Sequence, residues 1–133
     1  MSDDNVKLVQ SLYAAFGRGE IDTIAKAMAA DYRWRVAGDK KHFPTIGEWS
    51  GPGGVADFFA KVRQHLNVSE FSPREFYPSQ DRVFVLGHYK WTVAKTGKAV
   101  AADFVHIFTI KNGKVSGFQE FTDTATFAEA YRG

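Results

Sequence analysis

Apolar and polar residues alternate along three neighbouring stretches of the chain, 83–93, 100–110 and 115–122. Alternation with a period of two, together with many β-branched and aromatic residues, is typical of strands with one buried face. Short segments that contain Thr96-Gly97 and Asn112-Gly113 separate these stretches. The pattern predicts a meander of three long antiparallel strands, around which we expect the rest of the chain to be organised.

Helical spacing of apolar residues and capping signals predict four helices. We expect them over residues 4–17, about 21–30, a segment opened by Ser50-Gly51-Pro52, and 124–131. The link between the first two is short, which predicts a helical hairpin. Asp123 stands where it can cap the last helix.

Two more strands are expected before the meander. Residues 32–36 alternate aromatic and charged side chains, with Trp34 on the apolar face. Residues 70–77 form the other strand, where Pro73 indicates an edge position or a bulge. The segment 37–50 has no clean period, and two interpretations stay open for it. It is a lid or pocket rim, or it is a surface connection whose aromatic side chains cover the edge of the core.

The first turn of the meander sets which side chains face each other. A two-residue turn at Thr96-Gly97 pairs Lys95 with Lys98 and places Tyr89 opposite Phe104. Because a slip of one residue exchanges the two faces of a strand, the turn length decides what faces inward.

The second turn leaves an alternative open. A three-residue loop with Gly113 in the left-handed conformation places His106 opposite Phe118. A two-residue Asn-Gly turn would instead place Gln119 beside His106. On the three-residue interpretation, the helices meet a face that carries Val85, Tyr89, Trp91, Phe104, His106, Phe108, Phe118 and Glu120.

The opposite face of the meander is too apolar to be left to water. It carries Leu86, His88, Lys90, Asp103, Val105, Ile107 and Phe121, with Asp103 expected to form an ion pair with Lys90 or across a dimer. A patch of this kind predicts a homodimer that packs sheet to sheet.

Composition narrows the function classes. A chain of 133 residues predicts a single domain over 1–133, and 15% aromatic residues suit an apolar ligand site. A net charge of +2 without basic runs argues against nucleic-acid binding, and no apolar run is long enough for a membrane span. The absence of cysteine excludes thiol chemistry and fits a cytoplasmic protein. The four histidines show no metal-binding spacing, so we expect no metal and no cofactor.

His106 and Glu120 are the candidate catalytic residues, because both are expected among aromatic side chains on the inward face. Burial raises the pKa of a carboxylate and a nearby imidazolium lowers it, so such a pair can move a proton near neutral pH. The alternative is a core histidine whose carboxylate partner only fixes its tautomer. The candidate ligand-binding residues are Tyr13, Trp34, Trp49, Phe59, Tyr89, Trp91, Phe104, Phe108 and Phe118.

The order of these elements resembles the nuclear transport factor 2-like superfamily, in its ketosteroid isomerase-like and polyketide cyclase-like (SnoaL-like) branch. The residues that carry the resemblance are 12–16 with Gly19-Glu20-Ile21-Asp22, Gly51-Pro52, 106–115 and 120–123. The resemblance implies an α+β fold in which a cone-shaped, curved antiparallel sheet wraps around N-terminal helices and a deep apolar pocket (cystatin-like). The same fold hosts isomerases, cyclases, dehydratases, epoxide hydrolases and proteins without activity.

The residues of the isomerase branch are not matched one by one. Its helical Tyr falls one position later, at Tyr13, its general-base Asp falls at about Val36, and its second Asp falls at about His106. Two hypotheses therefore stay open. One is a cofactor-independent acid–base isomerase, dehydratase or cyclase that acts on a small apolar molecule. The other is a ligand-binding or dimeric interaction module without chemistry.

Overall fold

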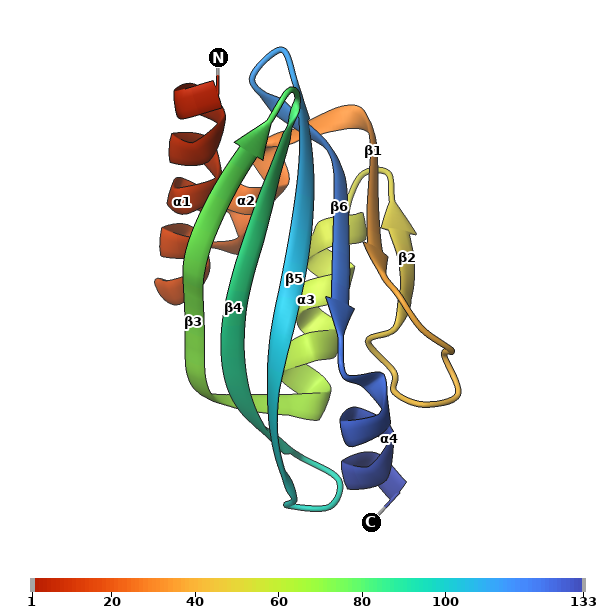
Figure 1. Cartoon of the computed structure of the whole chain (residues 1–133). Coiled ribbons are helices and arrows are strands. Elements are labelled where there is room, and N and C mark those ends of the chain that lie inside the picture. Colours follow the sequence, from red (N-terminus) through yellow and green to blue (C-terminus); the bar gives the residue numbers. More distant parts are fainter. Residues whose placement is uncertain (1, 133) are drawn as a thin grey trace.

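The computed structural model describes residues 2–132 and shows a strongly curved sheet with helices against one face (Figure 1). The helices are α1 (Ser2–Gly17), α2 (Ile21–Lys26), α3 (Gly54–His65) and α4 (Thr124–Arg132). The strands are β1 (Met28–Val36), β2 (Gly47–Ser50), β3 (Leu66–Ser79), β4 (Arg82–Val93), β5 (Ala99–Lys111) and β6 (Lys114–Thr122).

The six strands form one open sheet in the order β2-β1-β6-β5-β4-β3. The expected α+β fold with a curved sheet over helices is confirmed. The sheet is mixed rather than wholly antiparallel, because β1 runs parallel to β6 at its centre. Figure 1 shows α3 behind the middle of the sheet and α4 directly after β6. No helix within residues 2–132 has the length and apolar character that a membrane crossing requires.

The N-terminal helices differ from the prediction at their ends. The second helix stops at Lys26 rather than near residue 30, because Met28 already pairs with Val115 of β6. Pairing in the sheet here outweighs local helix propensity. The third helix starts at Gly54, after Gly53 in the left-handed conformation (φ 82°), so Pro52 precedes the helix instead of lying in its first turn.

The segment 37–50 is partly ordered by the sheet. Its last residues form the edge strand β2, which pairs with β1 through Trp34 and Trp49. Phe43 and Ile46 are fully buried, so this part of the segment belongs to the core. The other edge of the sheet is β3, where the predicted edge strand contains the predicted irregularity between Pro73 and Glu75.

The register between β4 and β5 is shifted by two residues from the prediction. The backbone N–H of Val93 donates to the carbonyl of Lys98 at 2.9 Å, so the turn is longer than Thr96-Gly97. Tyr89 therefore lies opposite Ala102, and Phe104 lies opposite Gly87. A shift of two keeps every side chain on its predicted face.

The turn between β5 and β6 has two residues, Asn112 (φ 52°) and Gly113 (φ 73°), rather than the three predicted. A two-residue turn alone would bring Gln119 to His106. Ile110 pairs with Val115, but Thr109 pairs with Gly117, so a bulge adds one residue to β6 between these two pairs. His106 therefore pairs with Glu120. Because of the bulge, Phe118 and Glu120 lie on their predicted face although the turn has two residues. The residues of the turn do not predict this bulge.

Tyr32 joins β1 to the start of α3. Its buried hydroxyl donates to the carbonyl of Gly51 at 2.8 Å and accepts from the N–H of Val55 at 3.0 Å. The second bond satisfies one of the free amides at the helix N-terminus. Tyr32 thereby fixes the position of α3 over the inner face of the sheet.

Candidate functional site

A cavity of about 80 Å³ lies between the inner face of the sheet and the helices. One buried water molecule needs about 10–15 Å³ of cavity volume, so this cavity holds several water-sized groups. Side chains from every helix and from β1, β3, β4, β5 and β6 line it, and most of them are aromatic or aliphatic. The polar exceptions are Tyr13, Thr45, Tyr89, His106, Glu120, Thr122 and Thr124.

Three of these polar side chains form a continuous chain of hydrogen bonds. The Tyr13 hydroxyl lies 2.6 Å from Nδ1 of His106, and Nε2 of His106 lies 2.7 Å from Oε1 of Glu120. The three residues come from α1, β5 and β6, so the site forms only when these elements are packed together.

The hydrogen bonds assign a role to each nitrogen of His106. Burial, together with the negative charge of Glu120, raises the pKa of Tyr13 well above its ordinary value, so the phenol stays protonated. In the neutral imidazole this phenol donates to Nδ1, and Nε2–H donates to the Glu120 carboxylate, which can only accept. Both nitrogens of His106 are thus hydrogen-bonded within the protein.

Stacked rings hold His106 in this position. The Phe104 ring lies 4.1 Å from the imidazole at an interplanar angle of 24°, and the Tyr13 ring lies 5.9 Å away on nearly parallel planes. His106 is 3% exposed, whereas the side chain of Glu120 is 17% exposed. All three residues line the cavity, and within residues 2–132 Glu120 carries the one carboxylate of its lining.

Three buried polar atoms in side chains of the cavity wall have no hydrogen-bond partner within residues 2–132. They are Nε1 of Trp34, the hydroxyl of Tyr89 and Nε1 of Trp91. The Tyr89 hydroxyl lies near Glu120 and Thr122, and burial together with the charge of Glu120 raises the pKa of Tyr89. Unpaired buried donors are rare in native proteins because each lowers stability.

The structure gathers most of the predicted site residues. Those that line the cavity are Tyr13, Trp34, Phe59, Tyr89, Trp91, Phe108, Phe118, His106 and Glu120. Trp49 lies outside the lining and packs edge-on against Phe58. Phe104 also lies outside the lining, behind His106.

The sequence analysis did not single out Phe16, Phe71 or Thr122, which also line the cavity. Phe71 contacts the rings of both Tyr13 and His106. Its place in a strand interrupted by proline hid the period-two signal that marks an inward-facing residue.

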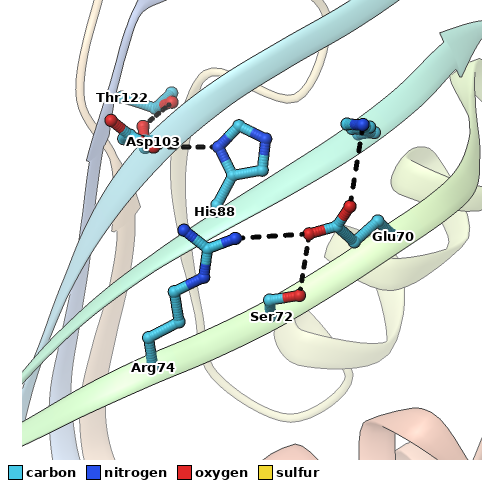
Figure 2. A network of polar contacts seen from close by, with 7 residues as sticks. Glu70, Ser72, Arg74, His88, Asp103 and Thr122 are labelled. Atoms are coloured by element: carbon cyan, nitrogen blue, oxygen red, sulfur yellow. Dashed lines mark hydrogen bonds and ion pairs between the residues drawn. The ribbon is translucent and has the colours of Figure 1, made fainter.

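A second polar cluster lies on the outer face of β3, β4 and β5, away from the cavity (Figure 2). Asp103 lies opposite His88 and accepts from its Nδ1 at 2.8 Å, so the predicted pairing of Asp103 with Lys90 is wrong. The two-residue shift in register explains the difference. Lys90 instead lies 3.8 Å from Glu70, which also contacts Arg74. These exposed ion pairs contribute little to stability.

A family model for the SnoaL-like domain matches residues 9–118 of the chain. No curated protein gives a significant match.

Solved structures match over nearly the whole chain. An NTF2-like protein of Burkholderia xenovorans LB400 is 28% identical, with a TM-score of 0.88 over 98% of this chain and 97% of that one. An NTF2-like protein of unknown function from Burkholderia pseudomallei K96243 is 28% identical, with a TM-score of 0.86 over 98% of both chains. TerC, co-crystallised with polyporic acid, is 28% identical, with a TM-score of 0.85 over 98% of this chain and 99% of that one.

Proposed function

The chain belongs to the SnoaL-like domain family, and we propose that it acts on a small apolar molecule by acid–base catalysis without a cofactor. The reaction is an isomerisation, a dehydration or a cyclisation. The observation that carries the proposal is the hydrogen-bonded chain Tyr13–His106–Glu120 in the wall of an apolar cavity.

Glu120 is the group that exchanges a proton with the substrate. Its Oε1 accepts from His106, and its carboxylate lines the cavity, where it can take a proton from a carbon or hydroxyl of a bound molecule. General-base catalysis requires the base to lie within hydrogen-bond reach of the proton it removes. Its position on the cavity wall makes Glu120 the base in this proposal.

His106 and Tyr13 hold the carboxylate in position. Both nitrogens of His106 are bonded within the protein, so His106 does not take a substrate proton directly. Nε2 already carries the proton that it donates to Oε1, so a proton taken from the substrate goes to Oε2, the other oxygen of Glu120. The same oxygen returns the proton to the product or to the leaving hydroxyl, and Glu120 is ionised again at the end of the reaction.

The similarity to TerC supports a role in binding a small molecule. TerC was crystallised with polyporic acid and shares 28% of its residues with this chain across nearly the full length of both. Polyporic acid is therefore the first natural compound to test for binding.

Proton abstraction can be measured before the natural substrate is identified. We would follow exchange of the C1 protons of 2-tetralone for deuterium in D2O by NMR. The intact protein should accelerate the exchange over buffer. Glu120→Gln keeps the shape of the side chain but removes the base, and it should lower the rate by about 10²-fold or more.

Glu48→Gln is the matched control, because Glu48 is an exposed carboxylate on β2 outside the cavity lining. It should exchange at the same rate as the unaltered protein. Equal rates for Glu120→Gln and the unaltered protein would remove the catalytic proposal.

The second candidate function is ligand binding without chemistry. The observation that favours it is that both nitrogens of His106 have partners within the protein, as in a structural histidine. Ligand binding and deuterium exchange, measured on the same protein, separate the two. NMR resonances of His106 that shift when polyporic acid is added, in a protein that exchanges 2-tetralone no faster than buffer, support binding alone.

A homodimer through the outer face of the sheet is part of the same proposal. Leu86 and Phe121 are 36% and 40% exposed on this face. The acidic and basic groups beside them, such as Asp103 and Arg74, can pair across a two-fold axis. A second copy of the chain is the occupant that we expect.

Light scattering after size exclusion tests the dimer. Leu86→Asp should convert a dimer to a monomer because it places a charge at the centre of the face. Val68→Asp is the control, since Val68 is 53% exposed but lies opposite Trp91, away from this face. A monomer for the unaltered protein, or dissociation by both variants, would contradict the proposal.

A further inference from the structure

The three unpartnered donors of the cavity wall indicate what kind of ligand the cavity binds. Indole N–H groups only donate, and a buried phenol in this setting also needs an acceptor. Trp34 is 4% exposed, Tyr89 2% and Trp91 6%, so bulk water does not satisfy them. Within residues 2–132 no protein group accepts from the two indole N–H groups, and the Tyr89 hydroxyl lies near Glu120 and Thr122 without a hydrogen bond of good geometry.

The donors lie on two sides of Glu120. Trp34 projects from β1, on one side of the strand that carries Glu120, and its ring stacks on Phe118 at 3.9 Å. Tyr89 and Trp91 project from β4, on the other side, with ring centroids 5.5 Å apart. The aromatic side chains between them supply flat apolar surface, which favours a ring compound.

Resting on the proposed function, we propose that the cavity selects an apolar ring compound with acceptor oxygens on opposite sides. Tyr89 and Trp91 bind one oxygen, and Trp34 binds the other. A molecule of the same shape without these oxygens leaves the donors unpaired. A site built to hydrogen-bond its ligand discriminates strongly against such analogues. Trp34, Tyr89 and Trp91 are thus the residues that determine specificity.

A pair of matched probes tests this inference. 1,4-Naphthoquinone and naphthalene share the same fused rings, but only the first carries two opposed carbonyl oxygens. The chain has no cysteine, so the quinone meets no thiol with which to react. Affinities of the two probes can be compared by NMR titration of the unaltered protein.

The three tryptophans provide an internal control for the titration. The indole N–H resonances of Trp34 and Trp91 should move downfield with the quinone beyond any ring-current shift that naphthalene causes. The resonance of Trp49 should stay in place, because Trp49 lies outside the cavity lining. This measurement needs no variant and so does not depend on how a variant folds.

Substitutions that remove the donors give a second readout. Tyr89→Phe keeps the ring and should weaken quinone binding about three- to tenfold, the range expected for one hydrogen bond. Trp34→Phe and Trp91→Phe also remove part of the aromatic wall, so they should weaken both probes, the quinone about three- to tenfold more than naphthalene. Trp49→Phe should change neither probe.

The outcomes separate this inference from the catalytic proposal. Equal affinities for 1,4-naphthoquinone and naphthalene, or binding of neither, would overturn the proposal that the cavity selects ligands with acceptor oxygens. Shifted indole resonances without any deuterium exchange of 2-tetralone would keep this inference and remove the catalytic function. Deuterium exchange that depends on Glu120, with no shift of the Trp34 and Trp91 resonances by the quinone, would keep the catalytic function and remove this inference.

Discussion

Gly87 is the residue whose small size allows His106 to be held by stacking. It lies on β4 directly opposite Phe104, which stacks on the imidazole. A Cβ atom at position 87 would lie 2.6 Å from the backbone oxygen of Ser72 and 2.8 Å from Cε2 of Phe104. Both distances are shorter than van der Waals contact, so the backbone of β3 or the Phe104 ring must move.

We predict that Gly87→Ala destabilises the protein by about 1–2 kcal/mol. Overpacking of a core typically lowers stability by about 1–3 kcal/mol. Replacing glycine by alanine recovers about 0.4–1 kcal/mol, because the unfolded chain loses conformational freedom. Phe104 is only 2% exposed and has no free space to occupy, so the overpacking term should dominate.

Gly117→Ala is the matched control. Gly117 also lies in a central strand, but a Cβ there would meet Thr109 at 3.5 Å, an ordinary contact. Both substitutions share the gain from the unfolded state, so their difference isolates the packing term of about 1–3 kcal/mol. We expect Gly117→Ala to match or exceed the stability of the unaltered protein.

Urea denaturation with linear extrapolation gives the free energy of unfolding of the three proteins. The NMR resonances of His106 should also move in Gly87→Ala, because the displaced Phe104 ring shields the imidazole differently. Equal midpoints for Gly87→Ala and Gly117→Ala would refute the packing argument.

Three further predictions concern individual hydrogen bonds. Tyr32→Phe leaves the N–H of Val55 at the start of α3 unpaired, while the carbonyl of Gly51 still accepts from Gly54. The variant should lower the free energy of unfolding by about 1–3 kcal/mol, whereas Tyr77→Phe on the surface should change it little. Tyr13→Phe removes the donor to Nδ1 of His106, while Glu120 still accepts from Nε2–H. The ¹⁵N resonance of Nδ1 should therefore move downfield, as expected for a ring nitrogen that loses a hydrogen bond, and Nε2 should stay protonated; an unchanged Nδ1 resonance would contradict the assignment. Hydrogen bonds to its carboxylate lower the pKa of Asp123 in the folded protein. Its contribution to the free energy of unfolding is therefore full above the pKa of the unfolded chain, 3.8, and is lost as the pH falls through the lower pKa of the folded protein. Asp123→Ala should abolish this loss, which acid denaturation of the two proteins will measure.

Much of the site could be predicted because side-chain facing depends only on parity. Tyr89, His106 and Glu120 all lie on their predicted face although both predicted registers are shifted by two residues. The sequence left two lengths open for the turn at Asn112-Gly113, and the structure has the two-residue form. The bulge in β6 opposite Thr109 was out of reach, because the turn residues do not encode an extra residue further along the strand.

The partner of His106 on α1 could not be predicted either. The Tyr13 hydroxyl reaches Nδ1 because α1 crosses the inner face of the sheet at one particular angle, and no local pattern encodes that angle. The parallel pairing of β1 with β6 has the same origin. Predictions from one sequence thus located the residues that face the cavity and the pair His106–Glu120, but not the bond from Tyr13 to His106.

The distance along the chain between Tyr13 and His106, 93 residues, has a consequence for biosynthesis. A ribosome releases α1 and β1 long before β6, the strand that β1 pairs with and that carries Glu120. Contacts of such long range form late, since closing the intervening loop lowers the chain entropy before any contact stabilises it. A nascent or C-terminally truncated chain therefore lacks Glu120 and leaves the aromatic side chains of the future cavity open to chaperones.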